Sequence, residues 1–563
     1  MSADATARSG GQVLVDQLRI HGADTVFCVP GESYLAVLDA LWAAQNDIRT
    51  IACRQEGGAT NMAEAYGKLT GKPGVAMVTR GPGACNGAIG VHTAMQDSTP
   101  MVVFIGQVAR DQFDREAFQE VDYRQFYGAI CKWVCQIETA DRIPELVSQA
   151  FHRAMSGRPG PVAVALPEDM LRDMVTVADA QPYIVARPGA DPLDIERMRA
   201  LLARAKRPLM VLGGAGWSQA ACDDIQAFAE ANDLPVATSF RCQDLFDNEH
   251  PNYAGELGTS VSPALAKRVA AADLLLVVGA RLGEMTTGGY TLVNVPTPAQ
   301  TLVHVYMDPD ELGRVYRPQL AVASSMASFA RAARAMGPVE SDAWTDWTRQ
   351  AKQDQLDNWK PTRPMPGAVD MHVVMQHLNE TLPDDAIIIN DAGNFSGWPQ
   401  RFYHFRKFRT QLAPTSGAMG YAVPAAVGAR HTCPDRPVIA FVGDGGALMA
   451  GQEVATAVQY GIDPIILVVN NNMYGTIRMH QDREYPGHPH AVGLNNPDFA
   501  RWAQSFGAHG ETVRRTEEFA PAFERAMKAG KAAVIEIQVD PEMITTRTTL
   551  TDVRKAAEAR LKS

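Results

Sequence analysis

An α/β fold of three doubly wound parallel-sheet domains is what this sequence predicts. Its 563 residues exceed what one hydrophobic core usually supports, so about three domains are expected. The strand candidates are near-continuous Val/Ile/Leu runs that end in Gly-rich turns, which is typical of parallel sheets covered on both faces. These runs alternate with helical segments, and loose polar passages divide the chain into three blocks.

The first block, residues 1–176, contains the predicted strands Val75–Val78 and Met101–Gly106. Before them, a short strand leads into an amphipathic helix whose apolar face is predicted to be Ala59, Met62, Ala63 and Tyr66. Glu56 then stands at the carboxyl end of the strand and at the start of the helix. An anion at a helix N-terminus is common capping, so the local sequence alone favours a structural role for Glu56.

The second block, residues 190–337, follows a polar, Pro-rich passage. Its predicted strands lie within Pro208–Gly216, Leu274–Arg281 and Leu302–Asp308. The glycines after the first two strands raise the alternative of a nicotinamide oxidoreductase. They lack the full dinucleotide-binding spacing and the acidic residue that follows it, which argues against that alternative.

The third block, residues 365–545, contains the most informative stretch, Val438 to Gly475. It consists of an apolar strand, a Gly-Asp-Gly turn, an amphipathic helix, a second apolar strand and an Asn run. Asp444 and Asn471 each follow the carboxyl end of a parallel strand, where open α/β sheets bind ligands. Their oxygens suit Mg²⁺, and the turn glycines let the backbone approach a phosphate: Gly443, Gly445 and Gly446. The unit therefore predicts a magnesium–diphosphate anchor.

Charge and hydropathy argue against a nucleic-acid-binding, membrane-spanning or secreted protein. The formal net charge of −11 argues against a nucleic-acid partner. No apolar run approaches the roughly 20 residues that span a bilayer, and Met1–Gly10 lacks the apolar core of a signal peptide. The 8 Cys show no zinc-type pairing. A cytoplasmic enzyme without a membrane partner is expected.

Gly-Asp-Gly followed, about two dozen residues later, by an Asn pair resembles the signature of thiamine-diphosphate enzymes. Within them the chain resembles, over nearly its whole length, the large subunit of acetohydroxyacid (acetolactate) synthase. The segments that carry this resemblance are Val78–Asn86, Ser98–Val108, Ala117–Asp122, Ser156–Val162 and Ser416–Ala429. The resemblance implies that Asp444, Asn471 and the backbone carbonyl of Met473 hold magnesium, with Tyr474 beside them in the cofactor site.

The resemblance also changes the interpretation of Glu56. Thiamine enzymes place a Glu here against the aminopyrimidine ring, where it stabilises the imino tautomer whose nitrogen removes the thiazolium C2 proton. By the same resemblance, the Gly417 carbonyl accepts from the cofactor's amino group and Met419 wedges under the cofactor. Phe118 and Gln119 line the cavity near the reacting carbons, and the Gly31 loop closes over the site. Without the family, Met419 reads as a core methionine and Gln119 as a surface amide.

The family resemblance implies an active site between subunits. The pyrimidine-binding block of one subunit faces the diphosphate-binding block of another, so a homodimer or homotetramer is expected. The implied reaction decarboxylates a small 2-oxo acid and joins the product to a second carbonyl. Simple 2-oxo acid decarboxylation and C–C lyase action on a hydroxyketone or diketone remain open. A non-catalytic cofactor-binding protein is a remoter alternative, because Glu56 and Asp444 are both present.

Several substrate-site positions depart from the family. The family's Asp-Arg pair, whose Arg helps hold the acceptor acid, falls on Glu284 and Met285, and its Lys falls on Glu168. Losing a cation weakens recognition of an acceptor carboxylate. The family's Trp falls on His480, which is interpreted either as a proton donor to a carbonyl or as a rim histidine. His92, one turn into a helix, is favoured as packing.

The middle block raises the question of a nucleotide. Relatives bind FAD or ADP there, or nothing, and the flavin-contacting positions correspond to Arg158, Gly214, Gly216 and Arg281. An acidic family position appears instead as Tyr306 or Met307. The sequence leaves FAD open and assigns it no redox role.

Overall fold

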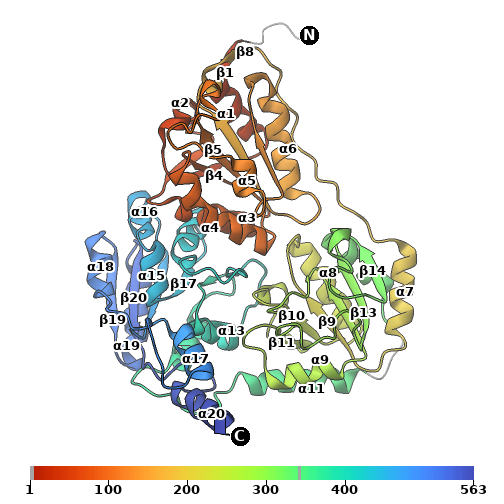
Figure 1. Ribbon diagram of the computed structural model, residues 1–563. Helices are drawn as coiled ribbons and strands as arrows, with labels where there is room; N and C mark the ends of the chain where they lie inside the picture. The colour runs from red at the N-terminus through yellow and green to blue at the C-terminus, as the bar shows by residue number, and fades with distance from the viewer. Residues whose placement is uncertain (1–5, 340–343, 563) are drawn as a thin grey trace.

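Three parallel sheets of six strands each, flanked by helices, organise the chain, as the fold class predicts. The structure is a computed structural model that describes residues 6–339 and 344–562. Figure 1 shows the N-terminal domain (red to orange) above the other two, with the central domain (yellow to green) beside the C-terminal domain (teal to blue). Strands β1 (Arg8–Ser9) and β8 (Met174–Val175) form a small antiparallel pair.

The N-terminal sheet has the strand order β3-β2-β4-β5-β7-β6. Its strands are β2 (Thr25–Cys28), β3 (Arg49–Ala52), β4 (Gly74–Val78), β5 (Met101–Gln107), β6 (Trp133–Gln136) and β7 (Pro161–Pro167). Its helices are α1 (Gly10–Ile20), α2 (Leu35–Ala43), α3 (Glu56–Thr70), α4 (Pro82–Asp97), α5 (Tyr123–Tyr127) and α6 (Ile143–Met155). The carboxyl ends of β2, β3, β4 and β7 therefore bring the segments after Cys28, Ala52, Val78 and Pro167 to one edge.

Helix α3 is buried on nearly every face, whereas an amphipathic helix was predicted. The predicted apolar face is buried, but so is most of the opposite face. The reason is that α3 also packs against α14 (Ala422–Thr432) of the C-terminal domain, where small residues allow close approach. A Cβ on Gly428 would lie 2.9 Å from the Met62 backbone. This contact joins the first and third domains within one chain.

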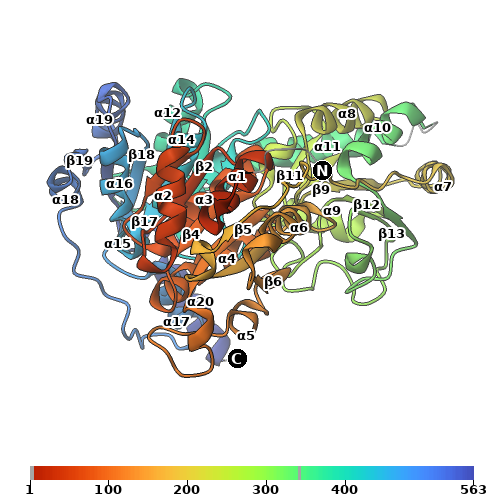
Figure 2. The same ribbon diagram turned by 90° about the horizontal axis from the view of Figure 1, so that it is seen from above.

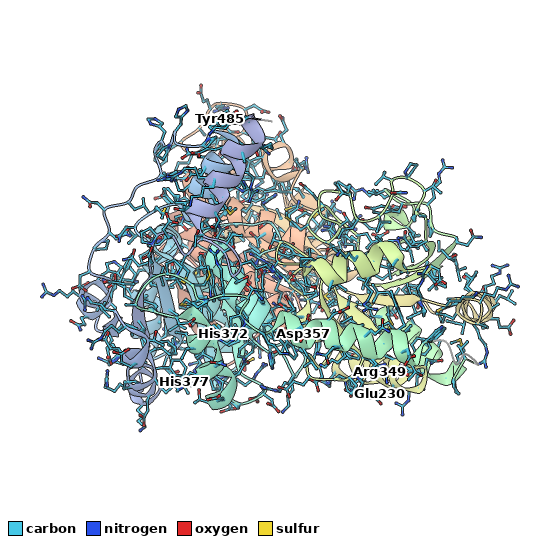
Figure 3. The ribbon with its side chains drawn as sticks, turned by 90° about the horizontal axis from the view of Figure 1, so that it is seen from below. Glu230, Arg349, Asp357, His372, His377 and Tyr485 are labelled. Atoms are coloured by element: carbon cyan, nitrogen blue, oxygen red, sulfur yellow. The ribbon has the colours of Figure 1, made fainter. Side chains whose placement is uncertain are left out.

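The central sheet has the order β11-β10-β9-β12-β13-β14. Its strands are β9 (Pro208–Leu212), β10 (Val236–Thr238), β11 (Tyr253–Glu256), β12 (Leu274–Val278), β13 (Thr301–Tyr306) and β14 (Leu320–Ala323). Its helices are α7 (Pro192–Leu202), α8 (Gln219–Ala231), α9 (Pro263–Ala271), α10 (Met326–Met336) and α11 (Thr345–Asn358). Figure 3 shows α11, with Arg349 and Asp357 labelled, along the underside of this domain, its Asp357 end directed toward His372 of the third domain.

The C-terminal sheet has the order β16-β15-β17-β18-β20-β19. Its strands are β15 (Ile387–Asn390), β16 (Gln411–Leu412), β17 (Val438–Gly443), β18 (Ile465–Asn470), β19 (His509–Val513) and β20 (Ala533–Gln538). Its further helices are α12 (Met371–Thr381), α13 (Gly397–Phe402), α15 (Asp444–Ala450), α16 (Glu453–Tyr460), α17 (Gly475–Glu484), α18 (Phe499–Ser505), α19 (Thr516–Lys528) and α20 (Leu550–Lys562).

The single helix predicted between Asp444 and Asn471 is two helices, α15 and α16. They meet at Gly451–Gln452, where the Val454 N–H donates to the Gly451 carbonyl at 3.0 Å. The Trp502 ring lies over Gly451, and a Cβ there would come within 2.7 Å of it. The break therefore sits where a bulky ring crosses the backbone.

The three domains pack against one another, with the N-terminal domain in contact with both of the others. Seen from above in Figure 2, the N-terminal helices α3 and α4 lie over the junction of the other two domains. No helix among the described residues has the length and apolar character needed to cross a bilayer.

Candidate active site

The predicted anchor residue Asp444 follows β17 directly and begins α15. It is only 3% exposed, and the Gly445 N–H donates to its Oδ1 at 3.0 Å. The backbone N–H groups of Asn472 and Met473 also lie against this carboxylate. Burial raises the pKa of the Asp444 carboxyl above its usual range. A bound cation would offset that desolvation.

The loop after β18 brings the other predicted ligands to Asp444. The Met473 N–H donates to the Asn471 Oδ1 at 3.2 Å. The loop is fastened on both sides, because the Tyr474 N–H donates to Val492 and the Leu494 N–H to Asn472, each at 2.9 Å. The loop that carries Asn471 and Met473 thus lies against Asp444 at one edge of the sheet. A carboxylate with amide and backbone oxygens is a donor set that would suit a hard cation such as Mg²⁺.

Close neighbours explain the glycines of the turn. A Cβ on Gly445 would lie 2.5 Å from the Tyr474 ring, and one on Gly446 would lie 2.7 Å from an Asp391 oxygen. A Cβ on Gly443 would meet the Phe395 ring at 2.9 Å. The space that a side chain would need is therefore filled by the site's own residues.

Sequence reasoning missed two residues that support the anchor. Asn496 donates from its Nδ2 to the Asp444 Oδ2 at 2.8 Å and to the Asn470 Oδ1 at 3.0 Å. Asp391, fully buried after β15, accepts from the Gly420 N–H at 2.8 Å, and burial raises the pKa of its carboxyl to about 6. Both are far from the motif in sequence, so no local pattern reveals them.

The segment 413–421 carries Gly417 and Met419. Gly417 has φ +70°, and open space lies where its Cβ would be. Met419 is 36% exposed, so it is not the core methionine that local sequence suggests. The Gly420 contact to Asp391 places this segment beside the Gly446 turn.

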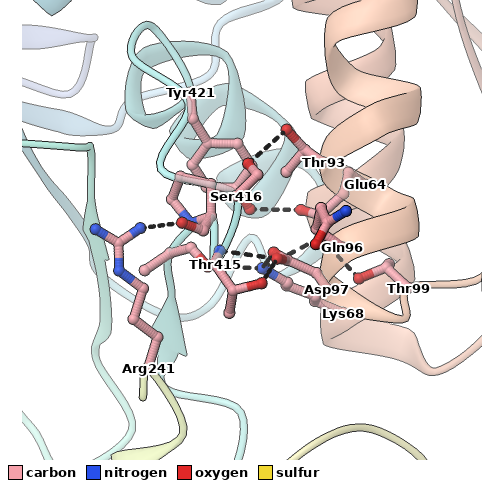
Figure 4. Close-up of polar contacts among 12 residues, drawn as sticks. Glu64, Lys68, Thr93, Gln96, Asp97, Thr99, Arg241, Thr415, Ser416 and Tyr421 are labelled. Atoms are coloured by element: carbon pink, nitrogen blue, oxygen red, sulfur yellow. Dashed lines mark hydrogen bonds and ion pairs between the residues drawn. The ribbon is translucent and has the colours of Figure 1, made fainter. Parts of the chain in front are cut away.

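A buried ion cluster on α3 and α4 holds both ends of this segment (Figure 4). Lys68 pairs with Asp97 and with Glu64, the latter at 3.2 Å. Lys68 also donates to the Ala413 carbonyl at 2.9 Å, and Asp97 accepts from the Thr415 N–H at 2.8 Å. At the far end the Tyr421 hydroxyl donates to Glu64 at 2.6 Å. We call Glu64, Lys68 and Asp97 the interdomain ion cluster.

Glu56 occupies the predicted position at the start of α3, but it does not cap that helix. The N-cap is Gln55, whose side chain accepts from the Gly58 N–H at 3.1 Å. Glu56 is 9% exposed and accepts from the Asn86 Nδ2 at 3.0 Å. Gln55 therefore performs the capping role that the local sequence suggested for Glu56. One carboxylate oxygen of Glu56 is left for another partner.

The segment before Glu56 is held by a fully buried carboxylate of the C-terminal domain. Glu453, at the start of α16, accepts from the N–H groups of Arg54 and Gln55, each at 3.0 Å. Thr456 donates to its other oxygen at 2.6 Å, and burial raises the pKa of the Glu453 carboxyl. Sequence reasoning missed this residue, because its partners lie in another domain.

Phe118 and Gln119 lie at the same edge of the N-terminal sheet as Glu56. Phe118 is 74% exposed, and Gln119 has φ +67° beside Gly81. Arg80 donates from Nε to the Phe118 carbonyl at 3.3 Å and forms an ion pair with Glu168 at 2.8 Å. The carboxylate that stands in place of the family's Lys is thus neutralised by a nearby arginine that sequence reasoning did not single out.

The third predicted element there, Gly31, packs against Thr79. A Cβ on Gly31 would lie 2.3 Å from the Thr79 side chain. The following residue, Glu32, pairs with Arg80 at 3.0 Å. The loop after β2 therefore packs against the segment after β4.

A large cavity of about 1540 Å³ opens where the three domains meet. Gly417 and His480 line it from the C-terminal domain, His92 from α4, and Met285 from the central domain. Glu56 and Asp444 are not among its lining residues. One chain therefore gathers the anchor residues in the third domain and the Glu56 group in the first.

The residues at the flavin-contacting positions make contacts within the protein. Arg158 is held by Ser98, Met95 and Glu311, and Arg281 donates to the Gln96 carbonyl at 2.8 Å. At the Gly214–Gly216 turn, the Met307 methyl lies 2.0 Å from where a Cβ of Gly216 would be. Gly214, Gly216 and Arg281 nevertheless line the three-domain cavity, so a flavin there would have to displace the flexible end of Met307 and replace the protein partners of the two arginines.

Comparisons with known proteins identify the family of all three domains. Three family models match: the N-terminal thiamine pyrophosphate (TPP) binding domain of thiamine pyrophosphate enzymes over residues 8–126, their central domain over 195–333, and their C-terminal TPP binding domain over 391–537. The acetolactate synthase large subunit of Parasynechococcus marenigrum is 33% identical over 94% of this chain and 87% of its own length. The chain belongs to the acetolactate synthase large-subunit family of thiamine diphosphate enzymes.

Other members show similar coverage. Acetolactate synthase isozyme 2 large subunit of Escherichia coli is 29% identical over 94% of this chain and 96% of its own length. The large subunit of Corynebacterium glutamicum is 30% identical over 95% of this chain and 87% of its own length. The similarity to the acetolactate synthase family extends through all three domains, which excludes a shared cofactor motif on an otherwise unrelated chain.

Proposed function

We propose that this chain decarboxylates a small 2-oxo acid with thiamine diphosphate and joins the remaining acyl unit to a second carbonyl compound. The observation that carries the proposal is the anchor at Asp444, together with a buried Glu56 that is not used to cap helix α3, in a chain of the acetolactate synthase family. Thiamine diphosphate, when bound, supplies a nucleophilic carbon and an electron sink that permits loss of carbon dioxide.

The chain's own groups have separate tasks in this proposal. Asp444, Asn471 and the Met473 carbonyl hold the magnesium that binds the diphosphate. Glu56 holds a proton against the aminopyrimidine ring, and Met419 and the Gly417 carbonyl orient that ring. His480, exposed on the wall of the three-domain cavity, donates a proton to the oxygen of the acceptor carbonyl. Gln119 and Phe118 exclude water from the reacting carbons.

A homodimer is the smallest unit that completes the proposed site. Glu56 lies on the first domain and Asp444 on the third, and the three-domain cavity of one chain is lined by neither. The surface that carries Phe118 is exposed in the single chain. We propose that it faces the anchor of a second copy. Light scattering of the purified protein tests whether the chain forms the dimer or larger assembly that this arrangement requires.

The metal requirement gives a first prediction. We expect a chelator to abolish activity and added Mg²⁺ to restore it. We expect Asp444→Asn to raise the Mg²⁺ concentration for half activation by more than about 10-fold, because one charge-assisted ligand is lost. The control is Glu517→Gln, a 69% exposed carboxylate in the same domain. Equal Mg²⁺ dependence in both variants would remove Asp444 from the metal site.

The contact of Met307 with the Gly216 turn gives a second prediction. We expect the purified protein to carry no stoichiometric flavin, because the Met307 methyl lies over Gly216 and because Arg158 and Arg281 are already bonded to protein groups. Visible absorbance of the protein, and mass spectrometry of the ligand released on denaturation, measure this. We expect Met307→Ala to open the turn, and added FAD then to bind more tightly than to the unmodified chain.

Product analysis tests the reaction itself. The purified protein is incubated with thiamine diphosphate, Mg²⁺ and pyruvate, and carbon dioxide and products are followed by mass. Release of carbon dioxide with a hydroxyketone product supports carboligation. Acetaldehyde alone would make the protein a simple decarboxylase, and no carbon dioxide from any 2-oxo acid would contradict the proposal.

A further inference from the structure

Glu536 is a buried carboxylate on β20, two strands along the C-terminal sheet from the strand that Asp444 follows. It is 2% exposed. Its Oε1 accepts from the Asn470 Nδ2 at 2.7 Å and from the Gln538 Nε2 at 3.3 Å. Its Oε2 accepts from the Thr512 hydroxyl at 3.0 Å. Because burying a carboxylate is costly unless its oxygens are hydrogen-bonded, these neutral donors are what hold Glu536 in place.

The carboxylate of Glu536 sets the direction of the Asn470 amide. A carboxylate accepts hydrogen bonds and does not donate them, so the Nδ2 end of Asn470 must face Glu536. The Oδ1 end then points away from Glu536, where it accepts from the Asn472 N–H and from the Asn496 Nδ2, each at 3.0 Å. Asn470 is itself buried at the end of β18, beside β20. One buried carboxylate thus determines the orientation of one buried amide.

Asn496 extends this order of donors and acceptors to Asp444. Its Nδ2 donates to the Asp444 Oδ2 at 2.8 Å as well as to the Asn470 Oδ1. A reversed Asn496 amide would place its oxygen against two other oxygens, so the donor end must face Asp444. The other Asp444 oxygen accepts from the Gly445 N–H at 3.0 Å. Both oxygens of the Asp444 carboxylate are therefore held, which fixes its rotation.

Glu536, Asn470 and Asn496 form one continuous set of hydrogen bonds, which we call the Glu536 chain. It spans β20, β18 and the end of β17, which are neighbours in the sheet. Its three residues line a second pocket of about 490 Å³, and none of them lines the three-domain cavity. The Glu536 chain therefore reaches Asp444 from outside the cavity, where it can hold the carboxylate without contacting a substrate.

We propose that Glu536 is a positioning residue for the magnesium site, because it fixes the Asp444 carboxylate through Asn470 and Asn496. Hydrogen-bond partners that orient a metal ligand typically change metal affinity by about 10- to 100-fold. Glu536 contacts neither the metal nor thiamine diphosphate in this scheme. The inference rests on the proposed function, since the magnesium at Asp444 is part of it.

The test is a calorimetric titration of Mg²⁺ into the full-length protein in excess thiamine diphosphate, with the heat of Mg²⁺ binding to free cofactor subtracted. We expect Glu536→Gln to raise the Kd for Mg²⁺ about 10-fold, the lower end of that range. Gln keeps nearly the same shape, but it loses the charge that strengthens the Asn470 hydrogen bond and it admits either orientation of that amide. Excess Mg²⁺ should restore thiamine diphosphate binding in this variant.

Thr512→Val is the matched control, because it removes a donor from the other oxygen of the same carboxylate. It should lower the thermal unfolding temperature as Glu536→Gln does, and it should leave the Kd for Mg²⁺ unchanged. An equal rise of the Kd in both variants would overturn the proposal, since lost stability alone would then explain it. An unchanged Kd in Glu536→Gln would also overturn it.

A double-mutant cycle tests whether Glu536 acts through Asn496. Asn496→Ala removes the contact to Asp444, so adding Glu536→Gln to it should raise the Kd for Mg²⁺ no further. Additive rises would overturn the proposal, because Glu536 would then reach the metal site by another route. If Glu536→Gln does not fold, Asn470→Ala interrupts the Glu536 chain at its middle, and an unchanged Kd in that variant overturns the proposal.

Failure of the proposed function gives a different result. An unmodified protein that binds Mg²⁺ with thiamine diphosphate but releases no carbon dioxide from any 2-oxo acid would contradict the proposed reaction. The Kd values of the variants would still decide the role of Glu536. An unmodified protein that binds no Mg²⁺ with the cofactor would overturn both.

Discussion

Replacing Glu56 with Gln is expected to slow turnover by about 10²- to 10⁴-fold, the range over which positioned acid–base groups act. Gln has nearly the same shape and can still accept the Asn86 hydrogen bond that Glu56 accepts at 3.0 Å. It cannot hold a proton against the aminopyrimidine ring. The loss should therefore be in catalysis and not in folding.

Two measurements separate those effects. Proton–deuteron exchange at C2 of bound thiamine diphosphate should slow along with carbon dioxide release, while the thermal unfolding temperature stays near that of the unmodified protein. Glu145→Gln, a 60% exposed carboxylate on α6 of the same domain, is the control and should leave both rates intact. Fast C2 exchange in the Glu56 variant would mean that another group performs the activation.

The residues that sequence could predict are those whose roles are local. The strand β17, the Gly-Asp-Gly turn and the loop after β18 form a continuous stretch, so spacing alone brings Asp444 and Asn471 to one sheet edge. The three parallel sheets follow from apolar runs that need no knowledge of their partners. Glu56 was placed correctly at a helix start for the same reason.

The residues that sequence could not reveal act across long separations. Asn496 reaches Asp444 from a loop beyond α17, and Glu453 reaches Arg54 from another domain. Arg80 neutralises Glu168 only because β4 and β7 end at the same edge. Each of these contacts depends on tertiary packing, which also buried the predicted polar face of α3.

Two sets of long-range contacts join the first domain to the third. Glu453 fixes the backbone before Glu56, and the interdomain ion cluster fixes residues 413–421. Interfaces between domains of one chain are often loose. Here buried charges at the interface make the position of Gly417 and Met419 dependent on α3 and α4.

Lys68→Met is therefore expected to be the most destabilising substitution outside the anchor, by about 3–5 kcal/mol, the usual result of removing one partner of a buried ion pair. Glu64 and Asp97 would face each other without a cation, and both carboxylates have almost no exposed surface. Burial already raises the pKa of the Glu64 carboxyl, and nearby Asp97 raises it further. The urea midpoint of unfolding measures the loss.

The control for that variant is Lys528→Met, whose partner Glu524 is 65% exposed and whose removal should cost less than about 1 kcal/mol. Adding Asp97→Asn to Lys68→Met should return part of the lost stability, because one of the two unpaired buried charges is removed. The double variant should still bind thiamine diphosphate more weakly than the unmodified chain, since the Lys68 contact to Ala413 is gone and the charged contact of Asp97 to Thr415 is weakened. Recovered stability with recovered cofactor affinity would show that the cluster serves folding alone. Recovered stability without recovered cofactor affinity would show that the same charges position the segment that holds the cofactor.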